Sequence, residues 1–156
     1  MTDLLVRLYD LPAFAATDRV AAAGITLRRA IGPELRAVTA WVDQQFGDPW
    51  ASEVAVGFSH VPITVWVAHK GPQILGFACH DTSARGFFGP TGVDQAARGQ
   101  GIGEALLIAT LTAMYEAGYG YAIIGDPGPV AFYRKRLDAL DIPGSTPGIY
   151  AGLLRS

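Results

Sequence analysis

Residues 93–107 read Val-Asp-Gln-Ala-Ala-Arg-Gly-Gln-Gly-Ile-Gly-Glu-Ala-Leu-Leu. Three alternate glycines, Gly99, Gly101 and Gly103, lead directly into an apolar run that is typical of a helix. Glycine has no β-carbon, so the backbone can approach a ligand closely and adopt dihedral angles that other residues avoid. The unpaired N–H groups and partial positive charge of a helix N-terminus, together with Arg98, favour an anion. This segment therefore predicts a site for a phosphate-bearing cofactor.

The spacing of these glycines separates the known kinds of phosphate loop. A dinucleotide fingerprint needs glycine at its first, third and sixth positions, whereas the sixth residue counted from Gly99 is Glu104. A Walker loop ends in Gly-Lys-Ser or Gly-Lys-Thr, and neither triplet occurs in the sequence. Arg98, Gly101 and Gly103 instead fit the pattern Arg-x-x-Gly-x-Gly. This pattern resembles the acetyl-coenzyme A (acetyl-CoA) signature of the GNAT superfamily of N-acetyltransferases.

A second motif of the same superfamily lies downstream. Residues 126–133 read Asp-Pro-Gly-Pro-Val-Ala-Phe-Tyr, which is similar to the GNAT pattern Asn-x-x-Ala-x-x-Phe-Tyr. Asp126 takes the Asn position and Pro129 takes the Ala position, while Phe132 and Tyr133 match. The resemblance covers about residues 25–140. It departs from the family at Leu137 and Asp138, where a Gly-Phe pair is usual.

The resemblance implies one GNAT-like domain over residues 1–156, of α/β (α+β) class. It implies a mixed, mostly antiparallel sheet flanked by helices, with splayed fourth and fifth strands. Residues 86–94, the expected fourth strand, contain Gly89, Pro90 and Gly92, which independently favour a bulge and a break in pairing. In the family the pantetheine arm enters such an opening. The implied cofactor is acetyl-CoA, and the implied cofactor-binding residues are Val93, Asp94, Arg98, Gly99, Gln100, Gly101, Ile102, Gly103, Asp126 and Phe132.

Alternating strand and helix patterns fill the rest of the chain. We expect strands at 1–9, 25–31, 63–69, 73–81 and 121–125, and a final strand reached through 143–150. We expect helices from Pro33 to about Phe46, over 51–58, over 101–117 and after Pro129, and a loose alanine-rich lead-in over 11–23. Trp41, Phe46, Trp50 and Phe58 wall an acceptor pocket or form core.

The catalytic chemistry rests on Tyr133. The resemblance implies that this tyrosine is a general acid for the departing thiolate, while the N–H near Val93 polarises the thioester carbonyl; a core tyrosine is the alternative. The general base stays open, because Phe87 and Phe88 occupy the place where relatives carry an acid or histidine. Cys79 and Asp81 alternate with His80 along a strand, so these three are not a nucleophilic triad. His80, Asp81 and Glu53 remain candidates for the base, and no spacing indicates a metal site.

Composition limits the other classes of protein. The 156 residues carry a formal net charge of −2, which argues against general binding of nucleic acid. Apolar runs are too short to span a membrane, and the sequence start is unlike a secretory signal. One cysteine, Cys79, cannot form an internal disulfide, which suits the cytoplasm.

The sequence thus predicts an enzyme that acetylates a primary amine of a small molecule, such as an amino sugar or amino acid. A non-catalytic acyl-CoA sensor and an acetyltransferase acting on a protein or peptide amine are the alternatives. A homodimer stays open.

Overall fold

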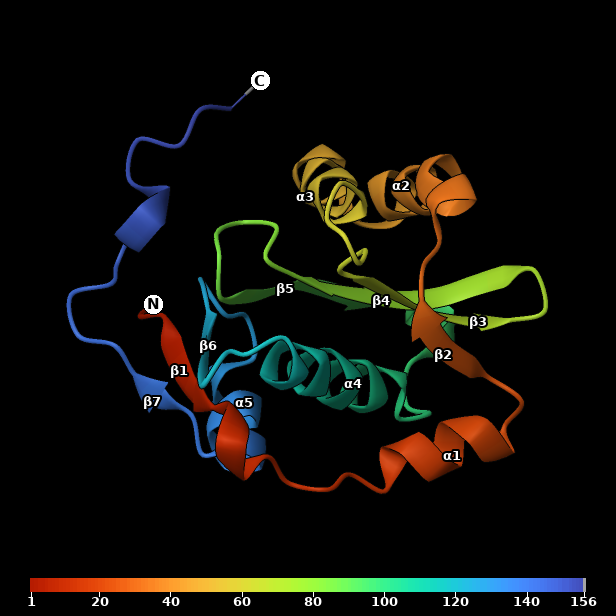
Figure 1. Ribbon diagram of the computed structural model, residues 1–156, viewed down its shortest axis with the longest axis horizontal. Helices are drawn as coiled ribbons and strands as arrows, with labels where there is room; N and C mark the ends of the chain where they lie inside the picture. The colour runs from red at the N-terminus through yellow and green to blue at the C-terminus, as the bar shows by residue number, and fades with distance from the viewer. Residues whose placement is uncertain (156) are drawn as a thin grey trace.

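The computed structural model describes residues 1–155 as one seven-stranded sheet with helices on both faces (Figure 1). The strand order is β2-β3-β4-β5-β6-β1-β7. The strands are β1 Leu4–Arg7, β2 Thr26–Arg29, β3 Val65–Lys70, β4 Gln73–His80, β5 Phe87–Val93, β6 Tyr121–Ile124 and β7 Leu140–Asp141. Among the described strands, β5 and β6 run parallel and the other neighbours run antiparallel. The expected mixed, mostly antiparallel sheet is confirmed.

Five α-helices complete the described fold: α1 Ala16–Ala22, α2 Leu35–Phe46, α3 Asp48–Phe58, α4 Ile102–Glu116 and α5 Val130–Leu137. Helices α2 and α3 cover one face of the sheet, and α1 and α4 cover the other (Figure 1). Helix α4 buries residues all round its circumference, including Leu106, Leu111 and Met114, because it lies between the sheet and α1. Helix α5 packs Tyr133 and Leu137 into the same core.

The aromatic residues of α2 and α3 pack against the core, and Trp41 also lines a cavity of about 420 Å³ beside α2. The rings of Trp41, Phe46 and Trp50 surround the fully buried Phe77 of β4, with centroids 5.7–6.3 Å from its ring. Phe46 also lies against Gly92 of β5, where a β-carbon would come within 2.5 Å of the ring. The core interpretation of this aromatic group is therefore the correct one, and the last residue of α2 packs against the end of β5.

Two segments differ from the sequence-based expectation. Residues 11–23 contain helix α1, whose Ala16 and Val20 are buried against the α4 side of the core. Small alanine side chains give little amphipathic signal, so the pattern did not reveal this helix. Residues 143–150 form turns, with a short 3-10 helix at Gly148–Tyr150, but the final strand expected after them is absent from the described residues up to 155. The edge of the sheet is the two-residue strand β7, which pairs with β1.

Strand β5 parts from β6 as predicted. Toward β4 it pairs from Phe88 through Val93, with one irregularity between Ala78 and His80. Toward β6 only Phe87 and Phe88 have partners, Ile123 and Ile124. The rest of β5 therefore presents one edge to an opening that leads toward the start of α4.

Candidate functional site

A cavity of about 470 Å³ lies where the open part of β5 meets the N-terminus of α4. Four segments build it. Its lining comprises Thr91, Gly92 and Val93 of β5, Arg98, Gly99, Gly101, Ile102, Gly103, Glu104 and Leu107 around the start of α4, Pro129, Phe132 and Tyr133 of the α5 region, and Arg19 of α1. Seven of the cofactor-binding residues proposed from the sequence thus lie together, with Tyr133 beside them.

The glycine loop is shaped by its backbone. Gly101 is the N-cap of α4 with φ +85°, and Gly99 has φ +87°, both in the left-handed region that favours glycine. The first helical bond that this cap accepts comes from the Ala105 N–H at 3.0 Å. The preceding N–H groups of the first turn are therefore directed toward the cavity, as an anion site requires.

Positive charge at the loop comes from two elements. Arg98 precedes the glycines, and its Nε donates to the Val93 carbonyl at 3.4 Å. Arg19 of α1 reaches the same loop and donates to the Gly99 carbonyl at 3.4 Å. Sequence reasoning missed Arg19, because no motif marks it and only the packing of α1 on α4 brings it here.

Glu104 and Arg136 form an ion pair at the same helix end. Their side chains lie 2.6 Å apart, so the carboxylate on the first turn of α4 is balanced by a cation from α5. Arg134 pairs with Asp141 at the surface, whereas Arg136 pairs with Glu104, which lines the cavity.

The free edge of β5 offers the groups of Val93 and not those of Asp94. The Asp94 N–H donates to the Leu75 carbonyl at 2.8 Å, so that group is already used. In an antiparallel ladder the alternate residue directs its N–H and C=O to the opposite edge, which here is the opening toward β6. The contact of the Val93 carbonyl with Arg98 places it on that edge. The Asp94 carboxylate instead caps the turn at Ala96, at 3.1 Å.

Two further residues proposed from the sequence stand outside the cavity lining. Gln100 donates its side-chain amide to the Ala97 carbonyl at 3.2 Å, which braces the loop. Asp126 is exposed just after β6, and its backbone N–H donates to Asp3 at 3.1 Å. Their roles toward a cofactor stay predictions.

Tyr133 is buried on α5, and its side chain lines the cavity. Burial raises the pKa of its hydroxyl to about 12, so the group carries its proton at neutral pH. The neighbouring Phe132 ring meets it edge-on with centroids 5.4 Å apart, which fixes its orientation. A protonated hydroxyl at the end of a groove can donate a proton or a hydrogen bond to a departing group.

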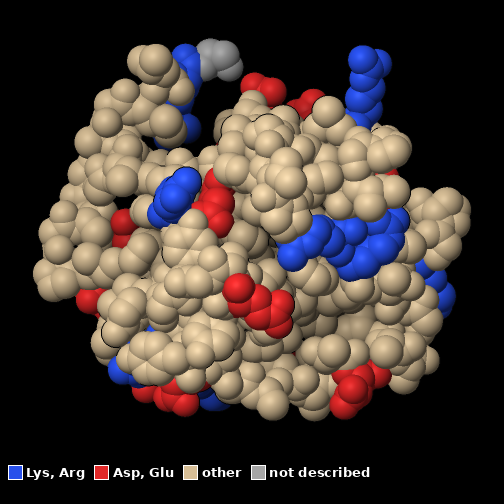
Figure 2. Space-filling view, viewed as in Figure 1, with Lys and Arg blue, Asp and Glu red and all other residues tan. Residues whose placement is uncertain are grey.

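A second cavity, about 760 Å³, lies on the α3 side of the sheet. It is enclosed by the start of α3, by the loop between β4 and β5 and by the C-terminal segment, which runs up toward α3 (Figure 1). Figure 2 shows the surface hollowed beneath that segment, with acidic and basic groups in small, separate clusters on this face. The cavity is thus open to solvent and to small solutes.

Glu53 is the half-buried carboxylate of this second cavity, and it accepts a hydrogen bond from the Ser83 hydroxyl. Tyr150 extends from the C-terminal segment to Gly125 at the end of β6, where a β-carbon would lie 2.5 Å from its hydroxyl. Burial raises the pKa of Tyr150, as do the nearby acids Glu53, Asp3 and Asp126. The second cavity, with Asp48 and Glu53 against one lining cation, Arg155, is therefore weakly acidic, and Tyr150 links it to the end of β6.

The residues Cys79, His80 and Asp81 do not form a nucleophilic site, as expected. Cys79 faces α2 and α3 in the core, and burial raises the pKa of its thiol far above the neutral range. His80 faces the opposite side, where it lines a third cavity near the C-terminal end of α4. His80 and Asp81 line neither the groove at the glycine loop nor the acidic cavity.

The comparisons with known proteins agree with this geometry. Residues 62–136 match the family model described as acetyltransferase (GNAT) domain, which includes the glycine loop and Tyr133. No curated protein matches the sequence significantly. None of the helices within residues 1–155 is long and apolar enough to cross a membrane.

Solved structures share the fold at low sequence identity. A glucosamine N-acetyltransferase region of a fungal multi-domain β-N-acetylglucosaminidase superposes with a TM-score of 0.74 and 16% identity, over 90% of this chain and 19% of that one. A GCN5-related N-acetyltransferase from Sphaerobacter thermophilus gives 0.68 and 20%, over 90% and 48%. A GNAT family N-acetyltransferase from Escherichia coli in complex with CoA gives 0.56 and 22%, over 72% and 67%. The chain thus spans less than half the length of the first two structures.

Proposed function

Given that the chain belongs to the GNAT superfamily of acetyltransferases, we propose that it transfers an acetyl group from acetyl-CoA directly to a primary amine of a small molecule. The observation that carries the proposal is the groove at the start of α4, where the glycine loop, the free edge of β5 and Tyr133 meet. Each of these three features matches one part of the cosubstrate: pyrophosphate, pantetheine arm and thioester sulfur.

The pyrophosphate lies on the first turn of α4 in this proposal. The N–H groups of Ile102, Gly103 and Glu104 point outward there, and Arg98 and Arg19 add two positive charges. The pantetheine amides then pair with the Val93 edge of β5, as a short added strand would. This arrangement directs the thioester toward Tyr133, because the arm continues along the same groove.

The chemical step needs no covalent enzyme intermediate. The lone pair of the amine nitrogen attacks the thioester carbonyl carbon, and the Val93 N–H donates to the oxygen as it gains negative charge. The C–S bond then breaks, and the sulfur takes a proton from the Tyr133 hydroxyl. The amine gives up a proton in forming the amide, and that proton replaces the one lost from Tyr133 through solvent. The products are an acetamide and the free thiol of CoA.

The acceptor amine enters from the acidic cavity under the C-terminal segment. A cationic amine is attracted by Glu53 and the nearby acids, and Glu53 then accepts the proton that the nitrogen must lose before it can attack. The amino-sugar activity named for the fungal structure supports including hexosamines among the candidate acceptors. The 760 Å³ volume accommodates a molecule of that size.

An acyl-CoA sensor is the second candidate, and Phe87 and Phe88 favour it because neither ring can take a proton at the strand position that serves as base in relatives. The decisive measurement is release of CoA thiol from acetyl-CoA with a panel of amino sugars, amino acids, polyamines and peptide N-termini. We expect turnover with at least one small amine. Binding of acetyl-CoA without thiol release on any amine would instead favour the sensor.

A variant tests the acceptor side separately. Glu53→Gln keeps the size and the hydrogen bond to Ser83 but cannot take a proton. We expect kcat/KM for the amine to fall, with acetyl-CoA affinity unchanged and with activity partly restored at higher pH as more free amine forms. Glu116→Gln, which changes an exposed carboxylate at the far end of α4, is the matched control. An unchanged pH profile in Glu53→Gln would exclude this residue as the base.

A further inference from the structure

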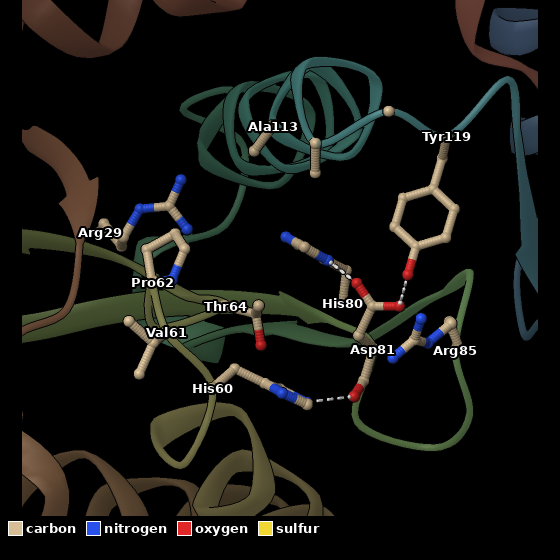
Figure 3. Close-up of a pocket in the computed structure, with 12 residues that line it drawn as sticks. Arg29, His60, Val61, Pro62, Thr64, His80, Asp81, Arg85, Ala113 and Tyr119 are labelled. Carbon is tan, nitrogen blue, oxygen red and sulfur yellow. Dashed lines mark hydrogen bonds and ion pairs between the residues drawn. The ribbon is translucent and has the colours of Figure 1, made fainter.

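The third cavity, about 480 Å³, lies at the end of α4 opposite the glycine loop. It is bounded by the last turn of α4, by the segment leading into β3 and by the end of β4 (Figure 3). Helix α4 has 15 residues, which corresponds to about 20 Å between the two helix ends at 1.5 Å per residue. No residue lines both this cavity and the groove.

Asp81 determines which ring nitrogen of His80, at the centre of this cavity, carries the proton. Its carboxylate accepts hydrogen bonds from the Gly86 N–H at 2.6 Å, the Tyr119 hydroxyl at 2.7 Å and His80 Nδ1 at 2.5 Å. Burial alone raises the pKa of Asp81, but these hydrogen bonds outweigh burial and lower it. The carboxylate is therefore ionised, and the proton between the two side chains belongs to His80 Nδ1.

His80 consequently presents a hydrogen-bond acceptor to the cavity. Burial lowers the pKa of the imidazole, so the ring is neutral at pH 7 and Nε2 carries a lone pair. The side chain is 4% exposed, and Nε2 is buried with no hydrogen-bond partner within the described residues. Figure 3 shows this nitrogen pointing away from Asp81, into the space between Arg29 and Ala113. A buried acceptor of this kind calls for a donor from a bound molecule.

Two arginines give the same cavity a positive character. Arg29 is fixed by the Trp66 ring, 5.1 Å from its guanidinium, and by a hydrogen bond to the Ile63 carbonyl, and its remaining donors face the cavity. Arg85 lies at the opposite side (Figure 3). Asp81 keeps its negative charge, but two guanidinium groups stand against this one carboxylate, so the charged side chains of the lining have a net positive charge.

We infer that this cavity binds a small hydroxylated carboxylic acid, whose hydroxyl donates to His80 Nε2 and whose carboxylate pairs with Arg29. The Asp81–His80 pair acts here as a fixed acceptor and not as the base for acetyl transfer. The ligand is distinct from acetyl-CoA and from the acceptor amine, because the cavity shares no lining residue with either of their proposed sites.

The test uses pairs of acids that differ in the hydroxyl group alone: citrate against tricarballylate, and malate against succinate. Calorimetry on the full chain should give about tenfold tighter binding for the hydroxylated member of at least one pair, the usual worth of one well-formed hydrogen bond. Equal binding of both members in each pair, or no binding of any of the four acids below about 10 mM, overturns the inference.

Variants show which side chains of the cavity bind the acid. His80→Asn keeps a donor toward Asp81 but removes Nε2, so it should abolish the preference for the hydroxyl. Arg29→Met keeps an apolar side chain against Trp66 but removes the charge. It should weaken the binding of the hydroxylated and the unhydroxylated acid alike, by about tenfold or more. The control is His69→Asn, which changes a histidine at the end of β3 away from the cavity. It should change neither the affinity for the acids nor the preference for the hydroxylated one. A preference that survives in folded His80→Asn contradicts the inference. Should that variant not fold, the wild-type His80 Nε2 resonance must shift with citrate and stay unchanged with tricarballylate.

Discussion

The two halves of strand β5 differ in both sequence and surroundings. Phe88 is paired on both edges, opposite His80 of β4 and Ile124 of β6, and Phe87 pairs with β6 and accepts a hydrogen bond from the Asp81 N–H at 2.9 Å. Thr91, Gly92 and Val93 are paired only toward β4, and their other edge faces the groove. The first half is therefore held by a strand on each side, while the second half leaves one edge without a strand partner. This open edge is the part of the strand on which we propose that the pantetheine arm pairs.

The largest expected effect on activity comes from a change at Tyr133, which lines the groove beside the open half of β5. Tyr133→Phe removes one hydroxyl whose pKa of about 12 keeps it protonated, so the thiolate would leave without a proton. We expect kcat to fall about 10²-fold or more, the usual scale for lost acid catalysis, while the Kd for CoA stays the same. Steady-state kinetics and calorimetry measure the two quantities. Wild-type turnover in this variant would leave Tyr133 a packing residue.

Hydrogen exchange compares the two halves directly. In the free protein the Val93 amide should exchange faster than the amides of Phe87 and Phe88, because its N–H is directed to the open edge. Acetyl-CoA at 100 times its Kd should slow exchange at Val93 and at Gly99–Gly103 by up to about 100-fold. Amides near His80 are the internal reference. Protection confined to the glycine loop would mean that the pantetheine arm does not pair with β5.

The contrast also shows what the sequence could reveal. Gly89, Pro90 and Gly92 predicted the parting of β5 from β6, because these residues interrupt a ladder through their own backbone chemistry. The glycine turn before α4 was equally predictable, since it depends on local backbone conformation. Arg19 and the acidic cavity were not, because they arise where α1 meets α4 and where the C-terminal segment meets α3. Such contacts join residues about 80 or more positions apart, so a pattern within a short stretch of sequence cannot predict them.

A smaller effect is expected from one methyl group at the glycine loop. Gly103 has no positive φ, and a β-carbon there would lie 3.6 Å from Val93, so Gly103→Ala introduces no strain in the free protein. The methyl group occupies the path of the pyrophosphate, and we expect CoA to bind about tenfold more weakly. Gly32→Ala is the matched control, because its β-carbon meets nothing within 4 Å and it lies outside the groove. A Kd unchanged by Gly103→Ala would contradict the placement of the pyrophosphate.

Gly101 is a poorer choice for this test. Its φ of +85° and a contact of 3.1 Å between an added β-carbon and Ala16 mean that a substitution there would disturb the fold.

The smallest effect concerns the doubly paired half of β5 and its neighbour His80. Burial lowers the pKa of His80 below its usual value of 6.5, although Asp81 opposes this shift and Arg29 and His60 assist it. Below pH 6.5 the unfolded chain therefore takes up a proton at this histidine that the folded protein does not, so stability falls as the pH falls. The Asp81 contribution persists in this range and is lost only as the pH falls below about 3.8, since its pKa is lowered. We expect the melting temperature to drop between pH 7.5 and 5.5, and to drop less in His80→Asn than in His69→Asn, as thermal denaturation would measure. Equal drops in the two variants would show that His80 titrates alike in the folded and unfolded chains, and that its burial beside β5 does not govern the acid side of the stability profile.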